Sequence, residues 1–215
     1  KNVSSEWISP VYFISSDKDA GARVIDLNGD GLVDVIEGSD FGTIVKNAYL
    51  NNGTGWTFYG NYSPPTVFTS NAKPDTGVRF ADLNGDGLPD LLEDYLNGTT
   101  TLNKAWLNNG TGWASTTIWD SPTPFTKDGF NIGRRLGDVN GDGFADILVA
   151  YSNTTSPEIS TYVKNTSSAY LLKSIINEYG GMVEIIYDSS TKVNNSPNGF
   201  SELGFNLWIV STQFF

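Results

Sequence analysis

A repeat with a period of 56 residues dictates what this chain can fold into. GARVIDLNGDGLVD at 21–34 returns as GVRFADLNGDGLPD at 77–90 and as GRRLGDVNGDGFAD at 133–146, so each copy starts 56 residues after the one before. Self-similarity at a fixed period of this size indicates an array of similar units, each of which buries its apolar face against its neighbours.

Two further motifs keep the same register. The first reads YLNNGTGW at 49–56, WLNNGTGW at 106–113 and, in a degenerate copy, YVKNTSSA at 162–169. The second is Trp-Ile-Ser-Pro at 7–10, which matches Trp-Asp-Ser-Pro at 119–122. Because this second motif precedes an Asp-rich segment each time, we expect the chain to begin partway through a repeat and to be part of a longer array.

Each unit contains four short runs with the pattern of β-strands. In the middle unit we expect strands at Gly77–Asp82, at Asp90–Leu96, at about 104–108 and from Trp113 onward. The Asn-Gly and Gly-Thr-Gly stretches are typical of hairpin turns, because Gly and Asn adopt positive φ at little cost. Four strands in a unit of this length are typical of a propeller blade.

The predicted fold class is therefore all-β, with three four-stranded propeller-like blades at residues 1–169 and a C-terminal β-hairpin extension at 170–215. The extension contains LKSIINEYGGMVEIIY at 172–187, which alternates on both sides of its Gly-Gly turn, and an apolar run, LGFNLWIV, at 203–210. A closed ring takes roughly four to eight blades, so three blades predict a partial or open β-propeller. The open ends either meet further blades of a larger protein, which we favour, or are covered by the extension or by another chain.

The Asp-rich segments at 26–34, 82–90 and 138–146 have the pattern of calcium-binding loops. Each places Asp, Asn, Asp and Asp at its first, third, fifth and ninth positions and Gly at its sixth. The glycine permits a sharp turn, and the seventh residue offers its backbone carbonyl oxygen. The predicted ligands are, loop by loop, Asp26, Asn28, Asp30, Leu32 and Asp34; Asp82, Asn84, Asp86, Leu88 and Asp90; and Asp138, Asn140, Asp142, Phe144 and Asp146.

An all-oxygen, carboxylate-rich donor set selects a hard cation, and Ca²⁺ tolerates such a site better than Mg²⁺. We therefore predict Ca²⁺ as the cofactor, with about three ions per chain. The alternative is that the loops are solvated turns. Carboxylates about 5 Å apart repel by about 3 kcal/mol per pair at an effective dielectric near 20, which argues for a cation in each loop.

The first two loops also fit the EF-hand pattern, because Glu37 and Glu93 occupy its twelfth position. We reject EF-hands because Val149 occupies that position in the third loop. In addition, Pro89 would disrupt the start of an exiting helix. The two glutamates are then either outer ligands or exposed strand residues.

An arginine stands three residues before the first Asp of each loop, at Arg23, Arg79 and Arg135. We expect these arginines either to orient a loop carboxylate or to link neighbouring blades; the alternative is an outward-facing strand residue. Trp56 and Trp113 open equivalent strands, and we expect them to pack between blades and not to serve as sugar platforms.

Composition excludes several classes of function. The chain has a net charge of −11 and contains neither cysteine nor histidine. The negative charge argues against nucleic acid as a partner. No segment approaches the roughly 18 apolar residues of a membrane span, so we expect no membrane insertion. Without histidine and cysteine, Ser-His-Asp and Cys-His catalysis are excluded.

The pattern D-x-N-x-D-G-x-x-D after a short strand, repeated and followed by Leu-Asn-Asn-Gly-Thr-Gly-Trp, resembles FG-GAP/VCBS-type repeats over about residues 1–169. The resemblance implies a calcium-carrying β-propeller. The extension resembles the segment after the repeats in large bacterial Rhs/YD-repeat proteins and in the B component of Tc toxins, with Gly204 in place of a proline. For this chain the resemblance implies a docking and gating module of a secreted or cell-surface protein.

We therefore expect a non-catalytic, calcium-stabilised scaffold or docking module of an Rhs/Tc-toxin-like protein, and not an enzyme. Its expected partners are other blades of the same larger protein or neighbouring copies of itself, with a protein or glycan ligand as a further partner. A carbohydrate-active enzyme would need a carboxylate pair outside the loops. No motif links the acidic residues available for such a pair, which are Asp19, Glu158, Glu178, Glu184 and Glu202.

The alternative function is a glycosylated surface adhesin or filament subunit that self-assembles through open blade edges. Eight N-glycosylation sequons favour this alternative, although turn chemistry explains part of their number. The sequons are at Asn2, Asn52, Asn61, Asn97, Asn109, Asn153, Asn165 and Asn194.

Overall fold

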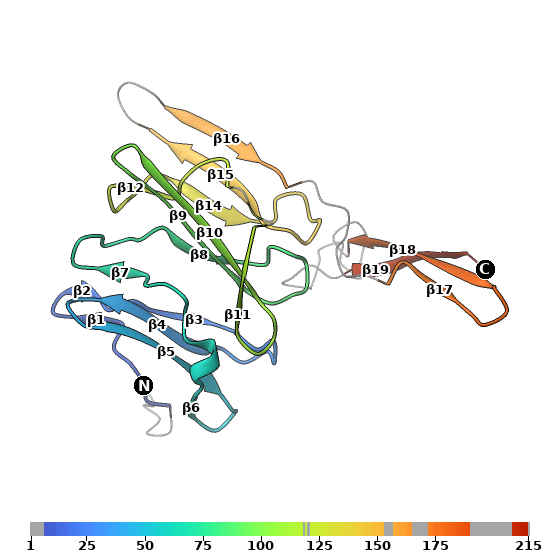
Figure 1. Ribbon diagram of the computed structural model, residues 1–215, viewed down its shortest axis with the longest axis horizontal. Coiled ribbons are helices and arrows are strands. Elements are labelled where there is room, and N and C mark those ends of the chain that lie inside the picture. Colours follow the sequence, from blue (N-terminus) through green and yellow to red (C-terminus); the bar gives the residue numbers. More distant parts are fainter. Residues whose placement is uncertain are drawn as a thin grey trace, which may run out of the picture.

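The computed structural model of the chain is all-β, with three blades stacked side by side and a further small sheet near the C-terminus (Figure 1). The residues that the structure describes are 7–117, 119, 121–152, 157–164, 172–189 and 208–214. Within these residues the blades form an open array, which confirms the predicted open, propeller-like fold class.

Blade 1 is a sheet of four antiparallel strands that follow one another along the chain. Its strands are β3 (Ala22–Ile25), β4 (Asp34–Asp40), β5 (Ile44–Asn51) and β6 (Trp56–Phe58). The first Asp-rich loop joins β3 to β4, so the blade places that loop at one end of its first hairpin.

Blade 2 repeats this order and confirms the strands predicted for the middle unit. Its strands are β8 (Val78–Ala81), β9 (Asp90–Asn97), β10 (Thr100–Asn108) and β11 (Trp113–Thr116). The third strand begins earlier than predicted, because β10 pairs with β9 as far as Thr100 across a tight turn at Gly98, where φ is +57°.

Blade 3 has three described strands, again antiparallel. They are β14 (Arg134–Gly137), β15 (Asp146–Tyr151) and β16 (Glu158–Tyr162). The fourth strand predicted for this unit would begin at about residue 169, and residues 165–171 lie outside the described residues.

Short strands lie in the segments that lead into the blades. They are β1 (Ile14–Ser15), β2 (Lys18–Asp19), β7 (Thr69–Ser70), β12 (Thr126–Lys127) and β13 (Phe130–Asn131). β7 pairs in parallel with β4, and β12 pairs in parallel with β9. The segment that leads into a blade therefore first joins the sheet of the preceding blade. Among the described residues, β1 pairs with β2 only.

Two hydrophobic cores fill the interfaces between the blades. Leu91 and Leu92 are neighbours in β9 and enter different cores, because successive side chains of a strand point to opposite faces. The core between blades 1 and 2 contains Leu27, Ile36, Ala48, Tyr62, Phe68, Val78 and Leu91. The core between blades 2 and 3 contains Leu83, Leu92, Ala105, Trp119, Phe125, Ile147 and Val149.

The glycine that opens each repeat allows a close backbone approach. At Gly77 φ is +83°, and a Cβ atom there would lie 2.2 Å from the carbonyl oxygen of Asp94 in β9. The carbonyl oxygen of Gly77 in turn accepts a hydrogen bond from the Asp94 N–H. Gly21 and Gly133 make the same approach, so this position tolerates only glycine.

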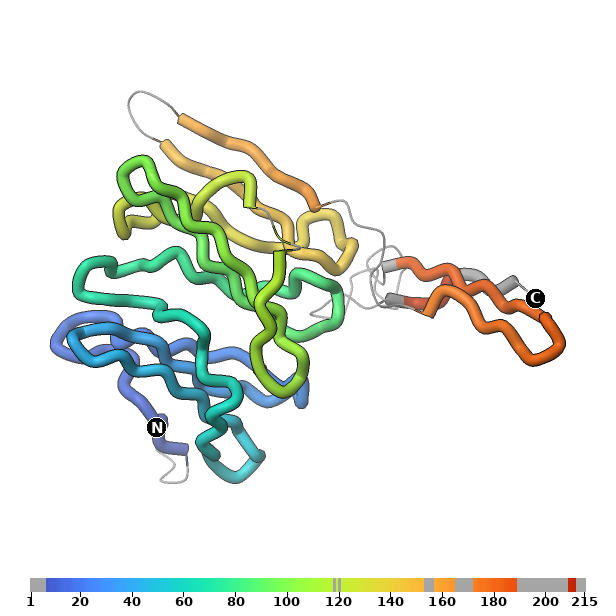
Figure 2. Tube along the Cα trace, in the orientation of Figure 1, coloured from blue at the N-terminus to red at the C-terminus, as the bar shows by residue number. Residues whose placement is uncertain are grey.

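The C-terminal sheet confirms the predicted hairpin. β17 (Ser174–Ile176) pairs antiparallel with β18 (Met182–Ser189), and β19 (Trp208–Phe214) pairs with the other edge of β18. The apolar run predicted as a strand at 203–210 is a strand from Trp208 onward and continues to Phe214, whereas 203–207 lie outside the described residues. Figure 2 shows this sheet apart from the three blades. No helix in the described part of the chain is long and apolar enough to cross a membrane.

Candidate calcium sites

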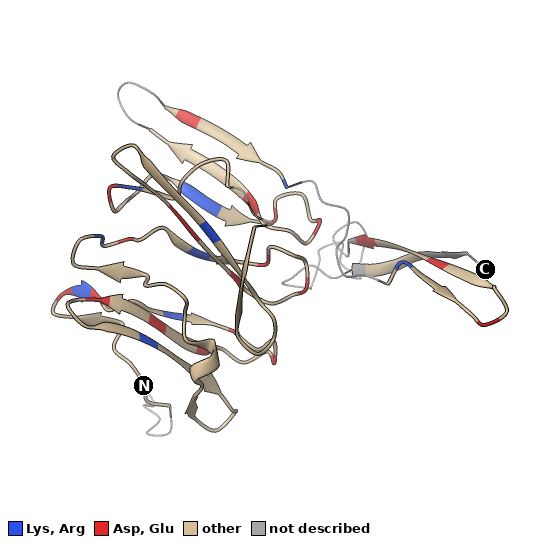
Figure 3. Ribbon diagram, viewed as in Figure 1, with Lys and Arg blue, Asp and Glu red and all other residues tan. Residues whose placement is uncertain are grey.

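The three Asp-rich loops lie on the same side of the array, at the ends of the first hairpin of each blade (Figure 3). We call them loop 1 (26–34), loop 2 (82–90) and loop 3 (138–146). Each loop joins two paired strands, so the register of that pair fixes where the loop begins and ends.

The first Asp of each loop closes the turn. In loop 1 the Oδ1 of Asp26 accepts a hydrogen bond from the N–H of Gly29 at 2.8 Å, and its Oδ2 accepts one from the N–H of Gly31 at 2.8 Å. Asp82 and Asp138 accept the equivalent pairs of bonds. Both glycines of loop 1 have positive φ, +75° and +84°. The fourth position therefore needs glycine as well as the sixth, which was the one expected from the pattern.

The last Asp ties the loop to the third strand of its own blade. Asp34 accepts hydrogen bonds from the N–H of Leu27 at 2.8 Å and from the N–H of Asn51 at 2.7 Å. In loop 3 the second donor is the N–H of Lys164, 2.9 Å from Asp146, so the degenerate motif at the end of blade 3 keeps its structural place. The last Asp is completely buried in all three loops, at 0% exposure.

The third and fifth positions hydrogen-bond to each other. The Nδ2 of Asn28 donates to Asp30 at 2.9 Å, and its Oδ1 accepts a bond from the Asp30 N–H at 3.1 Å. Asp30 also accepts a bond from the N–H of Leu32 at 2.8 Å. Loops 2 and 3 repeat these contacts. The structure therefore brings the predicted ligand residues of each loop into one small turn.

The carboxylates of loop 2 disfavour one another's ionised forms. The pKa of Asp90 is raised to about 7, mainly because the carboxylate is buried. Hydrogen bonds from the backbone of Asn108 and Leu83 act to lower this pKa, whereas the charges of Asp86 and Asp82 act to raise it. In loop 1, burial and the two neighbouring loop carboxylates likewise raise the pKa of the last Asp. A bound cation would offset this repulsion.

Each loop offers oxygen donors and negative charge to a cation. Among the described residues, no three acidic side chains lie close enough together to hold a metal ion as they stand. The loop carboxylates instead accept hydrogen bonds from the loop's own backbone N–H groups. Three carboxylates, one amide oxygen and one backbone carbonyl per loop are nevertheless the oxygen donors that Ca²⁺ prefers.

Glu37 and Glu93 lie on strands and do not extend the loops. Each stands three residues beyond the last Asp of its loop, roughly 10 Å farther along an extended strand. Glu37 accepts a hydrogen bond from Asn47 at 3.2 Å. Glu93 is buried, and burial raises its pKa against a hydrogen bond from Thr66 and the charges of nearby lysines. Neither glutamate is placed to serve as an outer ligand.

The repeated arginines link neighbouring segments and do not orient loop carboxylates. Arg23 pairs with Asp19 at 2.9 Å, and Arg79 pairs with Asp75 at 2.8 Å. The guanidinium of Arg79 also lies 5.5 Å from the ring centroid of Phe125, which belongs to the segment leading into blade 3. We did not predict these partners of the arginines from the sequence. A signal for them is present, because the first two repeats begin with Asp-x-Gly and the third begins with Asn-x-Gly.

The tryptophans contribute to packing. Trp113 lies against the core between blades 1 and 2, and its Nε1 donates to the carbonyl oxygen of Tyr62 at 3.0 Å, as expected for a residue between blades. Trp119 is buried in the core between blades 2 and 3. Trp56 is partly buried and meets the more exposed Trp7 edge-on, with ring centroids 5.9 Å apart.

Comparison with known families agrees with this arrangement. Residues 26–93 match the family described as FG-GAP-like repeat. Residues 109–213 match the family described as insecticide toxin TcdB middle/N-terminal region. The first match contains loops 1 and 2, and the second contains loop 3 and the C-terminal sheet up to residue 213.

Among the solved structures that match this chain is one described as a lectin of Agrocybe aegerita that recognises non-reducing terminal N-acetylglucosamine. It is similar to this chain at 23% identity and a TM-score of 0.37. The similarity covers 62% of this chain and 33% of the lectin chain, so this chain spans about a third of that protein's length. No curated protein matches the chain.

Proposed function

Because this chain carries FG-GAP-like repeats in a Tc-toxin-like context, we propose that it is a calcium-stabilised, non-catalytic β-propeller module of a secreted or cell-surface toxin-like protein. The observation that carries the proposal is the repeated loop, whose completely buried last Asp connects the loop to the third strand of its blade. An ion in the loop would therefore stabilise the loop and the blade together.

The residues that would hold the ion are the Asp and Asn side chains and the seventh-position carbonyl of each loop, as predicted from the sequence. Calcium supplies two positive charges and accepts an irregular set of oxygen ligands. The first Asp of each loop is already held by two glycine N–H groups, and the last by two further N–H groups. The fold therefore fixes the two ends of each loop before an ion binds.

A non-catalytic role is supported by the charge pairing in the cleft between blades 1 and 2. This cleft, of about 440 Å³, is lined by Asp19, Arg23, Asp75 and Arg79 together with apolar side chains. Both carboxylates are engaged by the arginines. Glycoside hydrolysis instead needs a carboxylic acid with a raised pKa. Burial acts to raise the pKa of Asp75, but the hydrogen bonds and charge of Arg79 outweigh it and hold that pKa below its ordinary value.

Calorimetric titration of the chelator-stripped chain with Ca²⁺ tests the metal assignment. The expected result is about three sites in the wild type. Asp30→Asn, Asp86→Asn and Asp142→Asn each remove one negative charge but keep a hydrogen-bond acceptor, so each variant should lose or weaken one site. Asp128→Asn, outside the loops, is the matched control. A stoichiometry that no loop variant alters would contradict the assignment.

A second candidate function, assembly with other blades or with neighbouring copies in an adhesin or filament, is favoured by the exposed segment at β1. Phe13 occupies the place of Phe68 and Phe125, because each of the three lies three or four residues after a Ser-Pro pair, at 9–10, 63–64 and 121–122. Phe13 is 42% exposed, whereas Phe68 and Phe125 are 2% and 0% exposed. The N–H groups of the two buried phenylalanines donate to the preceding blade. Ile14, next to Phe13, is 61% exposed.

Light scattering after gel filtration tests this assembly. A self-assembling chain would form oligomers that Ile14→Lys abolishes, because a lysine on a strand edge opposes pairing. Tyr179→Lys, at the exposed turn of the C-terminal hairpin, is the control and should leave oligomers intact. A monomer at every concentration would exclude assembly of copies and leave other blades of a larger protein as the partner.

A further inference from the structure

Successive blades are linked by a side chain that reaches back to the preceding loop. At the end of β10 the Nδ2 of Asn108 donates to the carbonyl oxygen of Leu27, the second residue of loop 1, at 2.7 Å. In the next repeat Lys164 occupies the place of Asn108. Its Nζ donates to the carbonyl oxygen of Leu83, the second residue of loop 2, at 2.5 Å. The two contacts occupy the same position in successive repeats, but the donor is a neutral amide in one and an ammonium group in the other.

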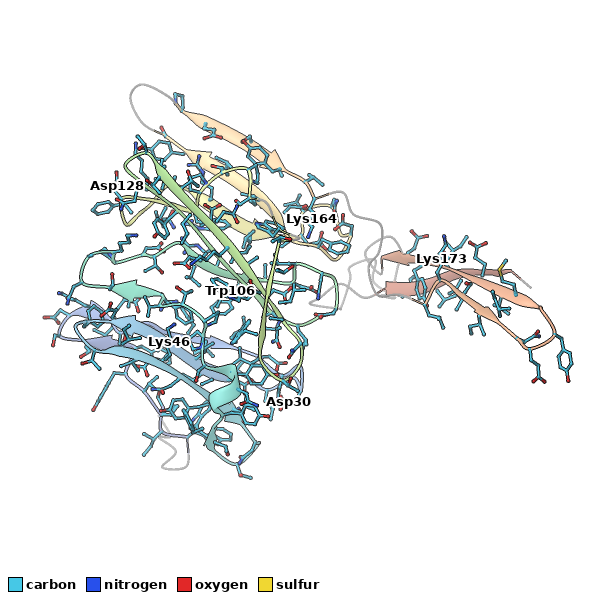
Figure 4. All side chains as sticks on the ribbon, viewed as in Figure 1. Asp30, Lys46, Trp106, Asp128, Lys164 and Lys173 are labelled. Carbon is cyan, nitrogen blue, oxygen red and sulfur yellow. The ribbon has the colours of Figure 1, made fainter. Side chains whose placement is uncertain are left out.

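The ammonium group of Lys164 is held beside loop 2 from several directions. It lies 4.9 Å from the ring centroid of Trp119 and 5.6 Å from that of Phe144. The backbone N–H of the same residue is fixed by Asp146 in loop 3. Figure 4 shows Lys164 at the end of blade 3, on the side of the Asp loops.

The surrounding charges are those of the loop carboxylates. Burial lowers the pKa of Lys164, and the negative charges of Asp90, Asp82 and Asp142 act in the opposite direction. Two of these three carboxylates are the first and last Asp of loop 2. The ammonium therefore supplies part of the positive charge that the loop 2 carboxylates require.

We propose that Lys164 acts as a built-in counter-ion that makes loop 2 a weaker calcium site than loop 1. The inference rests on the proposed calcium function. A fixed positive charge neutralises part of the field that attracts the ion and repels the ion directly. Loop 1 receives a neutral amide at the same place, so its field is not reduced in this way. The difference in calcium affinity is expected to be roughly tenfold, for one additional charge partly screened by solvent.

The two sites can be followed separately by ¹⁵N-resolved NMR during a Ca²⁺ titration. The sixth-position glycines, Gly31 in loop 1 and Gly87 in loop 2, donate their N–H groups to the first Asp of their own loops. Their amide resonances therefore report each loop on its own. In the wild-type chain, Gly87 should reach half-saturation at roughly tenfold higher free Ca²⁺ than Gly31.

Exchanging the two side chains should exchange the two affinities. Lys164→Asn should move the Gly87 midpoint down to that of Gly31, and Asn108→Lys should move the Gly31 midpoint up. Lys127→Asn, which removes the same charge from an exposed strand residue, should move neither midpoint. The same spectra show whether each variant is folded, and either of the two exchanges alone is a sufficient test.

The outcomes separate this inference from the function on which it rests. If both glycine resonances shift with equal midpoints, and neither exchange alters them, the loops bind calcium but Lys164 does not tune them. If neither resonance responds to Ca²⁺, the calcium function itself is wrong, and the inference is overturned with it.

Discussion

Asn108 joins two blades through a single hydrogen bond, from its Nδ2 to the carbonyl oxygen of Leu27, 81 residues earlier in the chain. Its Oδ1 accepts a bond from the N–H of Gly110 at 3.0 Å, and its own N–H donates to Asp90 at 2.7 Å. The residue is 1% exposed. Asn108 therefore makes three connections. Its side-chain Oδ1 fixes the hairpin turn, its side-chain Nδ2 bonds to loop 1, and its backbone N–H bonds to loop 2.

Replacing this side chain should loosen the interface between blades 1 and 2. Asn108→Ala leaves the buried carbonyl oxygen of Leu27 without its donor, which should lower the free energy of unfolding by about 2 kcal/mol. Asn109→Ala is the control, because the neighbouring side chain is exposed and bonds only within its own turn. Urea unfolding of both variants in saturating Ca²⁺ measures the difference, and equal losses would show that the contact between blades contributes nothing.

The close approach at the start of each repeat gives a second prediction. Gly77→Ala adds a Cβ that would lie 2.2 Å from a backbone oxygen, so a strand must shift, and the variant should lose more than about 3 kcal/mol of stability. Gly98→Ala also has positive φ, +57°, but has open space around its Cβ, and should lose only about 1 kcal/mol. Similar melting temperatures for the two variants would mean that backbone conformation alone, and not the close approach, selects glycine.

The ion pair between Arg79 and Asp75 gives a pH dependence with a defined sign. Burial raises the pKa of Asp75, but the hydrogen bonds and charge of Arg79 lower it by more, so the folded-state pKa is below the unfolded value of about 3.9. A group with a depressed pKa stabilises the fold above its unfolded pKa, and the contribution disappears as pH falls through the folded pKa.

Asp75→Asn should therefore cost about 1 kcal/mol at neutral pH. The gap between variant and wild type should narrow as the pH falls below about 4. Unfolding curves at a series of pH values, each compared with wild type under the same conditions, isolate this residue from the other carboxylates. A gap that stays constant across the series would mean that the loss comes from packing and not from the ion pair.

The repeat period and the turn residues were sufficient to predict the blades, because four strands of fixed spacing can pair in few ways. They also located the three turns and the Asp and Asn side chains gathered in each, but not the need for glycine at the fourth position. The pattern did not reveal that the last Asp is buried and bonded to the third strand, since that partner stands 17 or 18 residues away. Long-range partners of this kind leave no local signal.

Lys164 is a second residue whose contacts could not be predicted from the sequence. In the sequence, Lys164 belongs to a degenerate copy of the repeated motif, in which Lys replaces Asn and the Gly-Thr-Gly turn is lost. Only the fold shows that its backbone still holds loop 3 while its ammonium reaches loop 2. The sequence also could not predict that Phe13 is exposed while its counterparts are buried, because burial depends on which blade lies next to the segment.

The free energy of unfolding, measured with and without calcium, shows whether the three loops bind Ca²⁺ in the folded chain. If loops 1 and 3 bind Ca²⁺ with a Kd near 10⁻⁴ M and loop 2 binds it about tenfold more weakly, about 1 mM Ca²⁺ adds roughly 1.5 kcal/mol at each of loops 1 and 3 and roughly 0.4 kcal/mol at loop 2, or about 3 kcal/mol together. Urea unfolding in Ca²⁺ should therefore have a far higher midpoint than unfolding in chelator, and Mg²⁺ should not replace Ca²⁺. Identical midpoints in Ca²⁺ and in chelator, with the chain folded in both, would show that the loops are solvated turns and would contradict the account.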